Sequence, residues 1–115
     1  QLNYNLNNFQ ESLNNLRALN LELEQRGNEV SFLKDLSRLR LSLLLISENE
    51  IDEAREILNK NFIFFEELKY EFLGDAELKS SNQEAARKNY ETALELTSSE
   101  IHKELIRIKL SSIIN

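Results

Sequence analysis

At 115 residues, the chain is long enough to bury one continuous core and too short for two ordinary domains. It has no cysteine, which excludes a disulfide framework, a thiolate nucleophile and a zinc site with thiolate ligands. Its formal net charge is −6 and its basic residues are scattered among acidic ones, so a phosphate backbone would be repelled. Composition thus predicts a single domain that does not bind nucleic acid.

The chain lacks proline and has only two glycines, so little interrupts long helices. An all-helical domain is therefore predicted. Apolar runs such as Leu43 to Ile46 are far shorter than the roughly 20 residues that span a bilayer. The start at Gln1 and the absence of methionine suggest a segment of a longer protein, in which any membrane anchor would lie upstream.

The first predicted helix runs from about Asn8 to Gly27. Asn8 with Glu11 three residues later has the spacing of a capping box, in which each side chain accepts a backbone N–H at the start of a helix. Apolar residues then recur near helical spacing: Phe9, Leu13, Leu16 and Leu23. Residues 1–6 are interpreted as the end of a preceding helix.

Two further helices are predicted before residue 60. The first runs from Glu29 to about Ser47 and is apolar on more than one side, which is typical of a helix that is packed from both sides or meets a ligand. After a turn at residues 47–49, the second runs from Glu50 to about Asn59. It has one apolar stripe, in which Ala54 is small enough for close helix approach.

An aromatic segment follows at residues 61–65, and a helix then runs to about Lys79. We expect the rings of this segment to pack into the core, because most such clusters in small helical domains do so: Phe62, Phe64 and Phe65. Ser81 with Glu84 forms another capping box, which opens a helix that ends at Leu96.

The last predicted helix begins at a capping box of Thr97 and Glu100 and reaches about Ile114. Its apolar residues form one stripe with an adjoining one beside it: Ile101, Leu105 and Ile108, then Leu110 and Ile113. We expect this helix to seal the end of the domain.

Two stretches of the chain match each other at a fixed offset of 32 residues (73−41 and 86−54). A period near this length is typical of stacked helical hairpins. The matching positions, together with one small residue that follows, are predicted to pack the helices together: Leu41, Ser42, Ala54, Leu58, Leu73, Gly74, Ala86, Tyr90 and Ala93.

The predicted fold is all-α, a tetratricopeptide-like right-handed superhelix of antiparallel helix hairpins in a single domain over residues 1–115. Its repeat-like units cover about 1–27, 29–61 and 64–96, and a C-terminal capping helix covers 98–114. Hairpins of this kind cannot bury their apolar faces alone, so they stack and leave a surface that holds another polypeptide. The pattern predicts protein binding and not catalysis.

The second stretch, from Tyr70 through Leu73-Gly74 to Ala93, resembles the tetratricopeptide repeat in its order of large, small and aromatic residues. The first stretch departs from that pattern, because Arg38 stands at the first large position and Asn61 at the last small one. Ser12 and Leu16 resemble the second helix of a still earlier copy.

Residues 36–115 also resemble the periplasmic tetratricopeptide family typified by YfgM, the ancillary subunit of the Sec translocon. The segments that carry this resemblance are 39–42, 52–54, 72–76, 90–93 and 108–113. The resemblance implies a periplasmic domain on the bacterial inner membrane, anchored by an N-terminal membrane helix that this chain lacks. The partners it implies are the Sec translocon, a membrane-anchored chaperone of the prolyl-isomerase type and secreted chains.

No catalytic, metal or cofactor site is predicted. His102 is the only histidine, and without cysteine or a second histidine it has no partner with which to hold a metal. Carboxylate pairs such as Glu66-Glu67 lie on different faces of a helix, whereas acid–base catalysis needs convergent groups. We interpret these residues as structural or solvated.

A partner-binding face is predicted on the first helix of each hairpin, because these helices line the concave side of such a superhelix. It comprises Leu39, Leu43, Ile46, Glu71 and Asp75. A face that is part apolar and part acidic suits extended chains with apolar and basic segments. Two alternatives remain: a structural oligomerisation domain that pairs through the helix from Glu29 to Ser47, and a generic tetratricopeptide adaptor, which needs basic residues along its groove.

Overall fold

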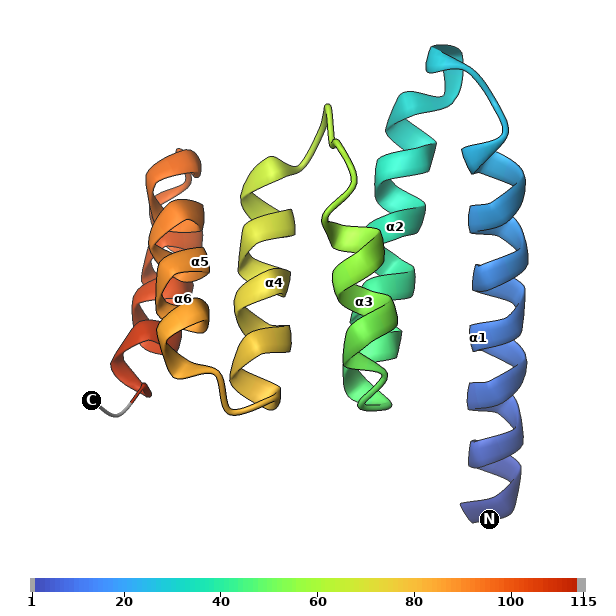
Figure 1. Ribbon diagram of the computed structural model, residues 1–115, viewed down its shortest axis with the longest axis horizontal. Helices are drawn as coiled ribbons and strands as arrows, with labels where there is room; N and C mark the ends of the chain where they lie inside the picture. The colour runs from blue at the N-terminus through green and yellow to red at the C-terminus, as the bar shows by residue number, and fades with distance from the viewer. Residues whose placement is uncertain (1, 114–115) are drawn as a thin grey trace.

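The structure is a computed structural model that describes residues 2–113, with side chains from residue 8. Within that range it contains six α-helices, one short 3₁₀ helix and no strand. The helices stand side by side in one row, from α1 at one end to α5 and α6 at the other (Figure 1). Their bounds are α1 Leu2–Glu24, η1 Asn28–Val30, α2 Ser31–Ser47, α3 Ile51–Leu58, α4 Glu66–Lys79, α5 Gln83–Leu96 and α6 Glu100–Ser111. The predicted all-α, tetratricopeptide-like fold is confirmed.

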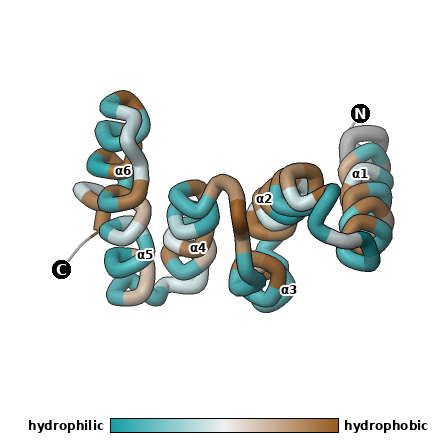
Figure 2. The backbone as a smooth tube through the Cα atoms, turned by 90° about the horizontal axis from the view of Figure 1, so that it is seen from above, coloured by the Kyte–Doolittle hydropathy of each residue, from teal (hydrophilic) through white to brown (hydrophobic). Residues whose placement is uncertain are grey.

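Seen from above, the row is staggered (Figure 2). The second helix of the α2–α3 hairpin, α3, lies to one side of the line from α1 through α2 and α4, and α6 lies to the other. Consecutive helices pack against each other along the chain, and α2 also packs against α4. The α2–α3 hairpin therefore contacts the next one through both of its helices.

The helix at the N-terminus is longer than predicted. α1 is continuous from Leu2 to Glu24, so Asn8 lies inside it and caps nothing. The physical reason is that residues 2–8 contain neither glycine nor proline, and nothing there stops the helix from extending. The predicted helix start at Asn8, and the separate helix end before it, are wrong.

Close packing within the hairpins depends on small residues. A Cβ at Gly74 would lie 2.5 Å from Cε1 of Tyr90, so only glycine lets α4 and α5 approach this closely. Ala54 and Ala86 are fully buried at the matching positions of α3 and α5. All nine residues expected to pack the repeats are buried: Leu41, Ser42, Ala54, Leu58, Leu73, Gly74, Ala86, Tyr90 and Ala93.

The turns inside the two hairpins are equivalent. Asn49 and Ser81, which are 32 residues apart (81−49), both have a positive φ, of 63° and 66°. In each turn the following N–H bonds back to a carbonyl five residues earlier, which is the pattern that ends a helix with a left-handed residue. The left-handed backbone of Ser81 therefore ends α4. Asn82, and not the predicted Ser81, caps α5 by accepting from the backbone N–H of Ala85.

The last helix is shorter than predicted, and its other face is buried. Ser99, and not Thr97, caps α6 by accepting from the N–H of His102. Ile106 is fully buried and Ile113 nearly so, because they pack with Ala86, Tyr90 and Ala93 of α5. The stripe expected to seal the domain faces outward instead: Ile101, Leu105 and Ile108 are 78%, 52% and 62% exposed.

A buried ionic network ties the first helices to the loop between α3 and α4. Arg38 donates two hydrogen bonds to Glu24, both of 2.7 Å, and others to Asp35 and to the carbonyl of Asn61. Asp35 is only 2% exposed and accepts from the backbone N–H groups of Ile63 and Phe64. Arg38 at a usually apolar repeat position is thus fully partnered.

Candidate partner-binding groove

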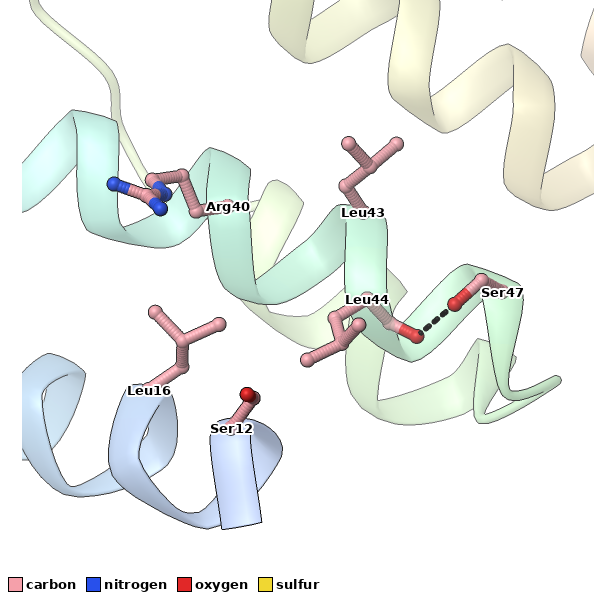
Figure 3. A pocket seen from close by; sticks show the side chains of 6 residues that line it. All are labelled: Ser12, Leu16, Arg40, Leu43, Leu44 and Ser47. Atoms are coloured by element: carbon pink, nitrogen blue, oxygen red, sulfur yellow. Dashed lines mark hydrogen bonds between the residues drawn. The ribbon is translucent and has the colours of Figure 1, made fainter. Parts of the chain in front are cut away.

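An open groove of about 460 Å³ lies between α1 and α2 (Figure 3). Leu16 and Ser12 point from α1 into the space between the helices, and Leu44 points toward them from α2. The groove is lined by Ser12, Leu16, Arg40, Leu43, Leu44 and Ser47. At its end, the Ser47 hydroxyl donates to the carbonyl of Leu44, so the last turn of α2 uses its own polar group internally.

A second hollow of about 190 Å³ adjoins the first and shares Leu16 and Arg40 with it. It is lined by Leu16, Leu19, Leu23, Leu33, Leu36, Ser37 and Arg40. Leu43 is 52% exposed, and Leu19 and Leu33 are exposed to a similar degree. A continuous leucine-rich surface open to solvent is a candidate interaction site. We call the two hollows together the α1–α2 groove.

Arg40 is the one charged residue that lines the α1–α2 groove. Each other arginine in the described part of the chain takes part in a hydrogen bond, an ion pair or another electrostatic or ring contact, and Arg40 has none of these. A guanidinium carries five donors and stays charged under all ordinary conditions. The centre of the groove is therefore a free cation among leucines.

Ion pairs fix the helix that forms one wall of the groove. Arg38 joins α2 to Glu24 of α1, and its hydrogen bonds hold the pKa of the Glu24 carboxyl below its usual range. Arg17 joins α1 to Glu53 of α3 through bonds of 2.7 and 3.0 Å, and these bonds lower the pKa of Glu53 in the same way. α1 is thereby held to both helices of the next hairpin.

The face expected to bind a partner is divided between buried and exposed residues. Leu39 and Ile46 belong to the hydrophobic core, and Glu71 is 7% exposed. Asp75 is partly buried beside Glu71. Leu43 is the one member of the set with a large exposed surface, and it lines the α1–α2 groove.

Glu71 and Asp75 are not free carboxylates, because α6 supplies cations to both. The ammonium group of Lys109 lies 2.6 Å from Glu71 and 3.0 Å from Asp75, and the Tyr90 hydroxyl donates to Asp75 over 2.5 Å. His102 Nε2 lies 2.6 Å from Glu71. With these three partners, Glu71 and Asp75 form an internal polar cluster between α4, α5 and α6 and not an acidic groove.

Burial and pairing act in opposite directions in this polar cluster. Burial alone would raise the pKa of Glu71, but the hydrogen bonds from His102 and Lys109 outweigh it and hold that pKa below its usual range. Burial likewise would lower the pKa of Lys109, but Glu71 and Asp75 raise it. Burial and Asp75 raise the pKa of Tyr90, so its hydroxyl stays a donor. The ion pairs therefore persist at neutral pH.

The aromatic segment before α4 is only partly buried, which corrects the prediction that its rings pack inward. Phe62 is in the core, where Arg38 and Lys69 lie over its ring. Phe64 is 41% exposed and stacks edge-on against Phe32 of α2 at 5.4 Å. The backbone N–H groups of Ile63 and Phe64 donate to the buried Asp35 carboxylate, and these bonds fix the loop against α2.

Sequence reasoning missed most of the groove. On α1 it singled out Leu16 as a repeat position, but Leu19 on α1, and Leu33 and Arg40 on α2, were not assigned to a site. The one available signal was the prediction that the helix from Glu29 to Ser47 is apolar on more than one side. Its second apolar side is the side that faces the groove.

Two other kinds of site were sought among the described residues. No cluster of three or more histidine, cysteine, aspartate or glutamate side chains there could hold a metal ion. None of the helices described is both long enough and apolar enough to cross a membrane.

The chain matches the family of tetratricopeptide repeat-like domains over residues 2–115. No curated protein and no solved structure matches it. Domains of this type are generally protein-interaction modules without catalytic activity. With its stacked hairpins, its small residues at the helix crossings and a match over nearly its whole length, the chain belongs to the tetratricopeptide repeat-like family.

Proposed function

We propose that this chain is the periplasmic domain of an ancillary subunit of the Sec translocon at the bacterial inner membrane. In that role it binds a membrane-anchored chaperone of the prolyl-isomerase type, and chains that emerge from the channel. Support comes from the family to which the chain belongs and from the resemblance of residues 36–115 to the YfgM-like proteins.

The observation that carries the binding role is the α1–α2 groove. It is open, leucine-rich and formed by two helices that ion pairs hold in place, so a partner meets a preformed apolar surface. A preformed groove between two helices suits a helical or extended apolar segment.

Site-specific photocrosslinking in bacterial cells tests this function. A probe at Leu43, inside the groove, is expected to trap the channel, the chaperone or exported chains. A probe at Glu95, exposed on α5 away from the groove, serves as the matched control and is expected to trap much less of them. Recovery of cytosolic proteins alone from the Leu43 probe would overturn the proposal.

A further inference from the structure

Three phenyl rings meet on the surface where α2 adjoins the start of α4. These two helices stand within the row and not at either end of it (Figure 1). The centroid of the Phe65 ring lies 5.2 Å from that of Phe32 and 6.4 Å from that of Phe64. Phe32 and Phe64 are 49% and 41% exposed, and Ile63 is 67% exposed. We call these four residues the aromatic patch. It is separate from the α1–α2 groove, because none of them lines that groove.

The backbone under the aromatic patch is held in one shape. The buried Asp35 carboxylate accepts from the N–H groups of both Ile63 and Phe64. Phe65 has a φ of 63°, a left-handed conformation that is rare and unfavourable for a residue with a large side chain. Such a backbone persists only where the surrounding contacts hold it. The rings are therefore presented by a fixed loop, which loses little conformational freedom when a partner binds.

Free carboxylates stand at the edge of the aromatic patch. Glu66 and Glu67 follow Phe65 directly, in the first turn of α4. Neither forms a hydrogen bond or an ion pair with any described residue. Lys69, one turn further along, donates to the carbonyl of Lys60 instead. An apolar surface with an unpaired acidic edge complements a segment that is both apolar and basic.

The neighbouring ring shows which cations such a surface accepts. Phe62, inside the core, has the Arg38 guanidinium and the Lys69 ammonium over its ring, each 5.4 Å from the centroid. In the described part of the chain, no cation lies over Phe32 or Phe64. A guanidinium stacks on a phenyl ring and also binds a carboxylate through two parallel hydrogen bonds. Arginine therefore suits a surface that offers a ring and a free carboxylate side by side.

A polar hollow of about 240 Å³ begins at Ile63 and extends to η1. Its charged side chains are already bonded within the chain. The side-chain amides of Asn28 and Asn61 also line it, and neither has a hydrogen bond to a described residue. Because an amide both donates and accepts, it matches the peptide groups of a main chain. The hollow thus suits an extended segment whose side chains lie on the aromatic patch.

We propose that the aromatic patch binds an extended segment of another protein, with an apolar side chain on the rings and an arginine against Glu66 and Glu67. The main chain of this segment lies along the polar hollow. The inference goes beyond the proposed function, which depends on the α1–α2 groove. It keeps the apolar and basic partner chemistry expected from the sequence and moves it away from Glu71 and Asp75, which are paired internally.

The test is a binding assay with three dye-labelled peptides of about ten residues, too short to form a stable helix in water. They share one leucine and differ two positions later, on the same side of an extended chain, where the residue is Arg, Gln or Glu. Fluorescence anisotropy is expected to show the Arg peptide binding at least about tenfold more tightly than the Glu peptide. The Gln peptide should fall between them, and the difference should shrink as salt is added.

A variant of the rings assigns the binding to the aromatic patch. Phe64→Ala is expected to weaken the binding of all three peptides by about tenfold. Ile108→Ala, which removes an exposed apolar side chain on α6, is the matched control and leaves binding unchanged. Circular dichroism checks that both variants fold, which is expected because neither side chain belongs to the buried core.

A variant of the carboxylates tests the charge. Glu66→Gln combined with Glu67→Gln is expected to remove the discrimination between the Arg and Glu peptides. Glu91→Gln combined with Glu95→Gln removes the same charge from two exposed positions on α5, so it is the matched control and keeps the discrimination. These variants leave every ring in place, and they test the proposal even if Phe64→Ala does not fold.

Different outcomes separate this inference from the proposed function. Equal binding of all three peptides, discrimination that survives without Glu66 and Glu67, or unchanged binding by a folded Phe64→Ala variant overturns the proposal for the aromatic patch. None of these results affects the crosslinks at Leu43, which report on the α1–α2 groove. Concentration-dependent self-association in sedimentation, abolished by Phe64→Ala, overturns the proposal in favour of a second copy of this chain as the occupant.

Discussion

At the scale of single residues, a repeat position that is usually apolar can hold a charged side chain when groups from distant parts of the chain form hydrogen bonds with it. Arg38 is such a case, because Glu24, Asp35 and the carbonyl of Asn61 all reach its guanidinium. Two of these partners lie 14 and 23 residues away. No local pattern in the sequence connects these partners to Arg38. From the sequence alone, Arg38 is therefore only a departure from the repeat pattern, and its ionic network cannot be predicted.

Gly74 provides the sharpest test at this scale. Gly74→Ala is expected to lower the melting temperature, because its Cβ would overlap the fully buried ring of Tyr90 at 2.5 Å. Overpacking costs about 1–3 kcal/mol, more than the roughly 1 kcal/mol that alanine gains over glycine inside a helix. Thermal unfolding followed by circular dichroism measures the difference.

Gly27→Ala is the control for Gly74→Ala. A Cβ at Gly27 would meet only the end of the Glu29 side chain, which can swing into solvent. Its φ of −81° is ordinary for any residue. The melting temperature is expected to stay unchanged or to rise slightly. A rise for Gly74→Ala instead would mean that α4 and α5 pack less closely than the structure has them.

At the scale of helices, the repeat period predicted the hairpins well because small residues at crossings are a local signal. Helix ends were predicted less well. Ser81 and Thr97 have the residue type of a cap, but Ser81 takes a left-handed backbone, and Ser99 lies closer to the start of α6 than Thr97 does. Which of two adjacent polar residues caps a helix depends on the path of the preceding turn.

The buried face of α6 could not be chosen from the sequence. Both of its stripes are apolar, so periodicity favours neither. The choice depends on Lys109 and His102, which face inward because Glu71 and Asp75 of α4 pair with them. That places Ile106 against α5 and turns the stripe that contains Ile108 toward solvent.

Substitutions on the two faces of α6 measure this assignment. Ile106→Ala is expected to destabilise the domain by about 2–4 kcal/mol, because it removes fully buried methyl groups and leaves a cavity. Ile108→Ala, the same substitution two residues later at a 62% exposed position, should leave stability nearly unchanged. Urea unfolding of both variants gives the comparison. Equal losses, or a larger loss at Ile108, would show that the helix is rotated.

At the scale of the whole molecule, ion pairs join helices that are not all neighbours in sequence. Arg17 connects α1 to α3, Arg55 connects α3 to α4 through Glu77, and Lys109 connects α6 to α4. Apolar packing supplies most of the stabilisation, and these pairs set how successive units are oriented. Of the candidate site, only Leu43 was foreseen, because the groove exists through the juxtaposition of α1 with α2 and not through any motif.

The same ion pairs predict how stability depends on pH. The carboxyls of Glu24, Glu53 and Glu71 all have pKa values below their ordinary value of 4.5 in the folded state. A lowered folded pKa stabilises the folded state above the unfolded pKa, and that contribution is lost as the pH falls through the folded value. Stability should therefore be level near neutral pH and fall once the pH drops below about 4.5.

Glu24→Gln isolates one of these groups. At pH 7 the variant is expected to be less stable than the parent, because Arg38 loses one of its two charged partners and keeps only Asp35. At pH 3 the gap should narrow, because the parent's own Glu24 is then increasingly protonated. Gln25→Ala, an exposed and uncharged position beside it, should follow the parent at both values. A gap between Glu24→Gln and the parent that is as wide at pH 3 as at pH 7 would show that Glu24 stabilises the domain by its shape and not by its charge.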